Sequence, residues 1–249
     1  MIINYHRPKT LEEALKLLTQ PNRLPLGGGT LLSQGKTDSA EAVDLQLLGL
    51  DSLAAKGNEL RLGATLTLQS LLESELCPDA LKTALKLEAP LNIRNSATVA
   101  GTLVSCDGRS SFATSLLALD AKLEIRESLE KSRVSSLGEF LPLRPHGLIT
   151  SIAIPNNVKF AFEYVARTPS DSPIVCVAAA VWGSGRTRVA VGGYGKSPML
   201  AMDGTSSDDV AVAARNAFHE ATDDFGSAEY RMDVAATLAK RCMERIVGA

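Results

Sequence analysis

Residues 98–111 read TVAGTLVSCDGRSS, and residues 26–32, further upstream, read LGGGTLL. Both stretches place glycines beside threonine or serine. Because glycine has no Cβ, its backbone approaches other groups closely and its N–H points readily at an anion, where a nearby helix N-terminus adds favourable charge. Local chemistry therefore leaves two interpretations for each stretch: a tight turn, which is the commoner use of glycine, or part of a phosphate cradle.

The glycine spacing excludes two familiar nucleotide-binding loops. No Lys-Ser or Lys-Thr pair follows either group of glycines, as a Walker loop requires. The GGGT stretch also lacks the GxGxxG spacing of a Rossmann turn.

Composition narrows the class of protein. The chain has 249 residues, of which 45% are hydrophobic and 22% charged, and its formal net charge is −2. This length allows one large or two to three small domains with a substantial core. The small net charge gives no reason to expect nucleic acid or an anionic membrane as a partner. No apolar run reaches the roughly 18 residues of a spanning helix, and the start lacks signal-peptide character, so we expect a cytoplasmic protein without membrane insertion.

Cysteines and histidines are scattered, which argues against a metal site or an iron–sulfur cluster in this chain. Such sites need closely spaced ligands. The candidates are Cys77, Cys106, Cys176, Cys242, His6, His146 and His219.

Hydrophobic periodicity predicts both helices and strands in the first part of the chain. A helix follows Thr10 with Glu13 in capping-box position, and a strand then leads into the glycine turn. LLSQGK, residues 31–36, opens a second helix or a tight loop, and residues 42–53 form a strand and a turn.

The middle of the chain is predicted to contain further strands and helices. We expect a strand over 59–64, a helix after Thr67, a helix over 79–89 and strand-like structure over 91–111. A helix passing into a strand follows over 112–127, and another strand ends at Pro155.

The last third begins with strands and closes with helices. Residues 174–194 predict a strand pair across GSGR, and two helical patterns follow over 208–221 and 227–247. Strands grouped before helices indicate an α+β protein and not a doubly wound sheet.

Several motifs in order resemble the FAD-binding medium subunits and domains of the molybdenum hydroxylases, the family that includes xanthine dehydrogenase and carbon monoxide dehydrogenase. Members show an AGGTDLL-like loop, an iRNxATiGGN segment, a SPxxD stretch and LLALDA. Here the counterparts are LGGGTLL, IRNSATVAGT, CDGRSS and LLALDA. The resemblance continues through FEYVAR, VAVGGYGKSP and GSAEYRMDVAATLAKR, close to the whole chain.

The resemblance implies a vanillyl-alcohol-oxidase (PCMH-type) flavin fold: two α/β subdomains that bind FAD between them and a C-terminal α+β domain, an antiparallel sheet with helices, covering the flavin. The corresponding division is 1–54, 55–157 and 158–249. Carried over by position, FAD contacts come from both glycine loops and from Ala89 and Ile149 nearby. The first loop supplies Leu26, Gly27, Gly28, Gly29, Thr30, Leu31 and Leu32, and the second supplies Ala97, Thr98, Gly101, Thr102, Ser105, Ser110 and Ser111.

Four positions of the presumed site depart from the family pattern. They are Leu31, Ala100, Thr102 and Ser111, of which Thr102 replaces the usual Asn and Ser111 the usual Asp. Asp107 is expected to compensate by accepting from a ribityl hydroxyl, and Arg109 by meeting a phosphate; the alternative is that both belong to an exposed polar turn.

The function implied by the resemblance is that of an oxidoreductase subunit. FAD in this chain would pass electrons from two [2Fe–2S] clusters in a small subunit to NAD or another acceptor, while a large subunit carries molybdopterin and selects the substrate. No side chain is expected to act as acid or base, because the cofactor carries the chemistry. Two alternatives remain open: a flavin-less homologue that serves as a structural or assembly subunit, and a nucleotide-binding sensor without redox activity.

Overall fold

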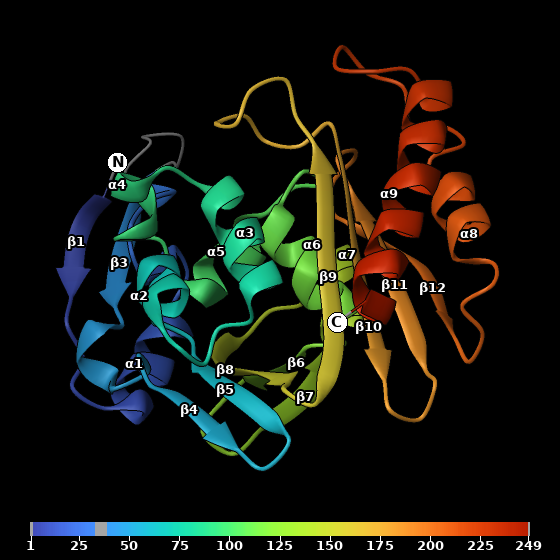
Figure 1. The fold of residues 1–249 in the computed structure, drawn as a ribbon. Helices are drawn as coiled ribbons and strands as arrows, with labels where there is room; N and C mark the ends of the chain where they lie inside the picture. The colour runs from blue at the N-terminus through green and yellow to red at the C-terminus, as the bar shows by residue number, and fades with distance from the viewer. Residues whose placement is uncertain (1, 33–38, 249) are drawn as a thin grey trace.

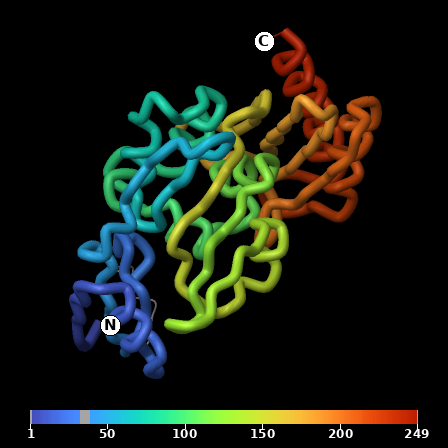
Figure 2. The backbone as a smooth tube through the Cα atoms, turned by 90° about the horizontal axis from the view of Figure 1, so that it is seen from below, coloured from blue at the N-terminus to red at the C-terminus, as the bar shows by residue number. Residues whose placement is uncertain are grey.

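A computed structural model describes residues 2–32 and 39–248 of the chain. It shows three sheets with helices between and around them, so the fold class is α+β, as predicted. Figures 1 and 2 show the first and last parts of the chain at opposite ends of the molecule, with the central part between them. The helix or loop predicted over 31–36 falls mostly outside the described residues.

The first sheet is parallel and has the order β1-β3-β2. Its elements are β1 (Ile2–His6), α1 (Leu11–Leu18), β2 (Arg23–Leu26), β3 (Ala40–Asp44) and a 3-10 helix over Gln46–Leu48. The predicted cap of α1 forms in part: Thr10 Oγ1 accepts from the Glu13 N–H at 3.2 Å, while the Glu13 carboxylate accepts from the Lys9 N–H. The small core beneath this sheet includes Ala14, Val43 and Leu148, the last from the central part.

The central sheet has five strands in the order β4-β5-β8-β6-β7, all paired antiparallel. Their bounds are β4 (Leu53–Lys56), β5 (Glu59–Gly63), β6 (Lys122–Arg126), β7 (Ser132–Ser136) and β8 (Leu148–Pro155). Apolar residues such as Leu62, Leu123 and Ile152 alternate with polar ones, so one face is buried under helices.

Six helices belong to this central part: α2 (Leu68–Glu73), α3 (Asp79–Glu88), α4 (Leu91–Arg94), α5 (Val99–Ser105), α6 (Ser111–Ala118) and α7 (Leu137–Leu143). The strand-like prediction for 91–111 was wrong, because α4 and α5 lie there. The reason is local capping and burial: Thr98 caps α5, and Val99, Ala100 and Leu103 pack into the core on its inner face.

The third sheet is antiparallel with the order β12-β11-β10-β9, and the predicted pairing across GSGR is confirmed as β10 against β11. Its strands are β9 (Val158–Val165), β10 (Val175–Trp182), β11 (Thr187–Gly192) and β12 (Met199–Gly204), followed by α8 (Val210–Asn216) and α9 (Ala228–Gly248). Successive side chains of β10 point to opposite faces of the sheet. Val175 and Val177 belong to the core shared with α8 and α9, whereas Cys176 and Ala178 belong to the core shared with α6. Figure 1 shows this sheet between those helices.

Within the described residues, no helix is both long enough and apolar enough to cross a membrane.

Candidate functional site

The two glycine loops meet at one side chain, that of Thr98. A Cβ placed on Gly27 would lie 2.8 Å from Thr98 Oγ1, and a Cβ placed on Gly101 would lie equally close at 2.8 Å. Thr98 Oγ1 accepts the Gly101 N–H at 3.1 Å and so starts α5. Glycine at both positions therefore leaves room for the Thr98 side chain between them.

Gly28 packs directly on the main chain of the second loop. A Cβ at this position would lie 1.6 Å from the carbonyl oxygen of Ser96, closer than any real contact. The second loop is itself held in place, since the Leu68 N–H donates to the Ala97 carbonyl and the Val99 N–H to the Leu66 carbonyl, both at 2.9 Å. The glycines are therefore needed, before any ligand is considered, because they let one loop approach the other closely.

The first loop also presents unused backbone donors. Over residues 2–32 and 39–248, the N–H groups of Gly27, Gly28 and Gly29 have no protein acceptor. Gly29 takes a left-handed conformation with φ of 71°. Successive N–H groups around a left-handed residue form a concavity that suits an anion, so the loop keeps the donors that a phosphate group would need.

Two polar cavities flank the Ala97–Thr98 segment. Cavity A, of about 240 Å³, lies among the α3–α4 junction, α5, the Asp107–Ser110 turn, Thr30 and Ser172. Cavity B, of about 400 Å³, lies among Gly27, Gly28, the residues around Gln46 and Asp51, and the start of α2. Ligand pockets generally occupy roughly 300–1,000 Å³, so the pair offers room of the right order for an extended ligand.

The structure brings ten of the seventeen predicted contact residues to these cavities. Thr30, Ala89, Ala97, Thr102, Ser105, Asp107 and Ser110 line cavity A, and Gly27, Gly28 and Thr98 line cavity B. Leu26, Gly29, Leu31, Leu32, Gly101, Ser111 and Ile149 line neither. Gly101 uses its N–H on Thr98, and the Leu31 side chain is 54% exposed to solvent.

The hydroxyl groups of cavity A are arranged as acceptors. Thr102 Oγ1 donates to the Thr98 carbonyl and Ser105 Oγ to the Gly101 carbonyl, each at 2.9 Å. Their protons are thereby used while their lone pairs remain, so they suit ligand hydroxyls better than phosphate oxygens. Ser111 is fully buried and its Oγ has no hydrogen-bond partner.

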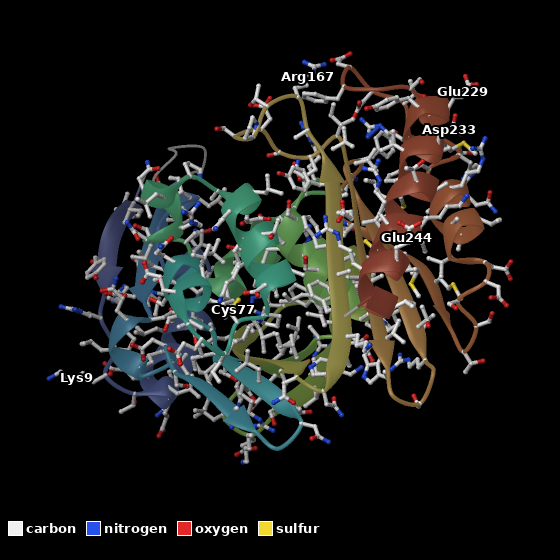
Figure 3. All side chains as sticks on the ribbon, in the orientation of Figure 1. Lys9, Cys77, Arg167, Glu229, Asp233 and Glu244 are labelled. Carbon is white, nitrogen blue, oxygen red and sulfur yellow. The ribbon has the colours of Figure 1, made fainter. Side chains whose placement is uncertain are left out.

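Arg109 lines cavity A, and contacts within the protein hold its guanidinium there, so its expected contact with a phosphate stays a prediction. Its Nε donates to the Pro173 carbonyl at 3.0 Å and an Nη to the Ser172 carbonyl at 2.7 Å, and the guanidinium stacks 4.0 Å from the Phe225 ring centre. Arg167, labelled in Figure 3 on the loop after β9, approaches the same ring. Arg109 therefore fastens the third part of the chain beside cavity A.

Sequence patterns missed several lining residues. Glu88, Cys106 and Ser172 line cavity A, and Gln46, Asp51, Thr65, Thr67, Ser70, Asn95 and Ser96 line cavity B. Asn95 and Ser96 lie inside IRNSAT and were within reach of the motif comparison. Cys106 likewise lies inside CDGRSS, whereas the others come from segments without a glycine motif, so only folding reveals them.

Glu88 is the most unusual of the missed residues. Its carboxylate accepts from the Ser110 hydroxyl at 3.0 and 2.9 Å and from the Phe112 N–H at 2.9 Å. Burial nevertheless raises the pKa of this carboxyl above its ordinary value, with nearby Asp107 adding to the effect.

Comparison with known proteins shows which proteins this chain is similar to. Residues 1–157 match the family model described as the FAD binding domain in molybdopterin dehydrogenase. The protein YgfM of Escherichia coli K12 is 27% identical over 247 residues, covering 96% of this chain and 94% of its own. The carbon monoxide dehydrogenase medium chain of Afipia carboxidovorans is 28% identical over 277 residues, covering 97% and 96%.

A solved structure shows the same fold over the full length. A chain in the crystal structure of the cyanide-inactivated Cu,Mo-CO dehydrogenase superposes with a TM-score of 0.85 at 23% identity, covering 100% of this chain and 98% of that chain. The fold of this protein is thus that of a known α+β architecture, including the antiparallel third sheet.

Proposed function

The chain belongs to the family of FAD-binding domains of molybdopterin dehydrogenases, and on that basis we propose that it is the FAD-carrying subunit of a molybdenum hydroxylase complex. In this proposal it accepts electrons from the [2Fe–2S] clusters of a small subunit and passes them to NAD or another acceptor. A large subunit with molybdopterin transforms the substrate. The relatives named as medium chains support this division of labour.

The observation that carries the proposal is the meeting of the two glycine loops between two polar cavities. Three unused N–H groups on Gly27, Gly28 and Gly29 suit the diphosphate of a dinucleotide. Hydroxyls of Thr102 and Ser105, with lone pairs available, suit the ribityl chain. The residues present therefore fit FAD.

The protein's own part is positioning. Bound FAD would supply the electron-transfer chemistry, so no side chain need serve as acid or base. Thr98 sets the distance between the loops, and Arg109 holds the Ser172–Pro173 segment beside cavity A. Transfer from a partner's cluster requires a stable contact surface with that partner, which a standard interface supplies at about 1,600 Å² in total.

The first test is the visible absorption spectrum of the purified protein before and after FAD is added and the excess removed. We expect a retained, vibrationally resolved flavin band. The same band should be lost or weakened in Gly28→Ala and kept in Gly183→Ala, because a Cβ on Gly183 meets no atom within 4 Å. No flavin in the purified protein or in complexes co-expressed with candidate small and large subunits would overturn the proposal in favour of a structural subunit.

The second test concerns electron transfer. The small subunit, chemically reduced under anaerobic conditions, should bleach the flavin band of the assembled complex, and NAD or another acceptor should restore it. A flavin that binds but is never reduced by the partner would favour a nucleotide-binding sensor.

A further inference from the structure

Glu88 lies where α3 ends and cavity A begins. The residue before it, Leu87, is buried, and the residue after it, Ala89, lines the cavity with it. Its carboxylate reaches the start of α6, where it accepts from the Ser110 hydroxyl and the Phe112 N–H. Glu88 therefore lines cavity A while its carboxylate is held at the start of α6.

No cation balances this carboxylate among the residues that the structure describes. The charged group that acts on it is Asp107, from the turn before α6, and the two titratable neighbours are the buried thiols of Cys106 and Cys176. Arg109, the nearby cation of cavity A, uses its guanidinium on the carbonyls of residues 172 and 173. A partly buried carboxylate without a counter-charge is costly unless donors satisfy it.

The donors present use only part of the acceptor capacity of the carboxylate. Oε2 accepts from the Phe112 N–H, the single proton of the Ser110 hydroxyl lies within reach of both oxygens, and the Ser111 N–H also acts on the carboxylate. An ionised carboxylate has about four acceptor sites, so Glu88 keeps unused acceptor capacity at a position that lines cavity A.

We propose that Glu88 is a cofactor-binding residue of this chain, with its carboxylate accepting a hydrogen bond from a hydroxyl or N–H group of the dinucleotide bound in cavity A. The inference rests on the proposed function and adds a contact that neither glycine loop supplies.

A change of protonation follows from this contact. The buried carboxyl has a raised pKa before binding. A donor supplied by the ligand stabilises the charged form and lowers that pKa. Binding of the dinucleotide therefore releases a proton. The affinity for the dinucleotide rises as pH increases through the raised pKa of Glu88.

The test is calorimetric titration of the protein with FAD in two buffers of different ionisation enthalpy, from pH 5 to 8. Wild type should release a proton on binding. Glu88→Gln should release none and should bind FAD roughly tenfold to a hundredfold more weakly at pH 8, as expected for a lost charged hydrogen bond. Glu75→Gln, at an exposed carboxylate after α2, is the matched control and should behave as wild type.

The competing explanation is that Glu88 only caps α6. In that case Glu88→Gln would change the melting temperature without FAD but leave affinity and its pH profile as in wild type, and the proposal would be overturned while the proposed function stood. Wild type that binds FAD without releasing a proton overturns it as well, whether or not the variant folds. Wild type that never binds FAD overturns both proposals together.

Discussion

Thr98 is the residue on which both glycine loops depend. It accepts the Gly101 N–H, and its side chain fills the space beside Gly27. The family resemblance predicts that the glycines contact the ligand, whereas the structure shows that Gly28 and Gly101 make close contacts within the protein. Among these glycines, those of the first loop keep their N–H groups available, whereas the N–H of Gly101 is already used.

Replacing Gly28 by alanine tests the contact between the loops. The added Cβ would lie 1.6 Å from the Ser96 carbonyl oxygen, and hydrogen bonds of Ala97 and Val99 hold the segment that follows Ser96. We expect a loss of about 1–3 kcal/mol in the free energy of unfolding, measured with urea. Gly183→Ala, in open space, is the control, and equal stability of the two variants would contradict the packing argument.

Replacing Thr98 separates its hydroxyl from its methyl group. Thr98→Ala removes the cap of α5 and should cost about 1 kcal/mol of unfolding free energy, whereas Thr98→Ser keeps the hydroxyl and should cost less. Urea unfolding of the two variants checks this. A serine variant as unstable as the alanine variant would assign the effect to the methyl group instead.

At the scale of elements, α6 connects the site to the third sheet. All eight of its residues are buried, and two of its three hydroxyls are satisfied locally: Thr114 donates to the Ser110 carbonyl and Ser115 to the Ser111 carbonyl, whereas Ser111 Oγ has no partner. Arg188 of β11 donates to the carbonyl of Leu117 near the end of α6, and to Asp203 of β12. The third sheet is therefore tied to the helix whose first residues adjoin cavity A.

Asp203 should make stability depend on acid pH. A paired hydrogen bond from Arg186, at 2.8 Å to each oxygen, lowers the pKa of this carboxyl, with Arg188 adding to the effect. A lowered pKa gives stability that is present above the ordinary aspartate range and is lost as pH falls through the lowered value. Asp203→Asn should cost roughly 1–2 kcal/mol at pH 7, since the pair is partly exposed.

The difference between wild type and Asp203→Asn should shrink as pH falls below about 4. Urea unfolding at pH 7 and pH 3 measures it, with the exposed Asp208→Asn as control. A difference that is independent of pH would show that the charge on Asp203 does not stabilise the fold.

For the whole molecule, one core joins the central and third parts. The same cluster contains Phe112 and Leu116 from α6 and Cys176, Ala178 and Ala190 from the third sheet. Arg144 adds a polar connection, since it donates to the carbonyls of Val104 and Lys196, 3.0 and 3.1 Å away. Residues 1–157, which match the family model, therefore need the third sheet to cover the apolar face of α6.

A fragment of residues 1–157 should accordingly fold poorly. It would expose the face of α6 that packs on β10 and β11. We expect binding of a hydrophobic dye and a broad urea transition by circular dichroism. A sharp transition at the midpoint of the full chain would show that the third part adds no stability to the first two.

Cysteine reactivity reports on the integrity of the whole core. All four thiols are buried, and burial raises the pKa of each to about 12. Figure 3 shows Cys77 inside the central part of the molecule. Iodoacetamide at pH 8 should therefore modify the native protein very slowly and all four cysteines once guanidinium unfolds it, as counted by mass spectrometry. Rapid modification of the native chain would contradict the closed core.

The sequence by itself determined the fold class, most helices and strands, and the two glycine loops, because caps, alternation and glycine chemistry act between near neighbours. It missed α4 and α5, where small and β-branched residues resemble a strand but Thr98 and core packing favour a helix. Only the tertiary structure decided that Gly28 meets Ser96, that Arg109 binds carbonyls 172 and 173, and that Glu88 reaches cavity A. These contacts join segments far apart in the chain, and their geometry depends on how the three sheets pack around α6.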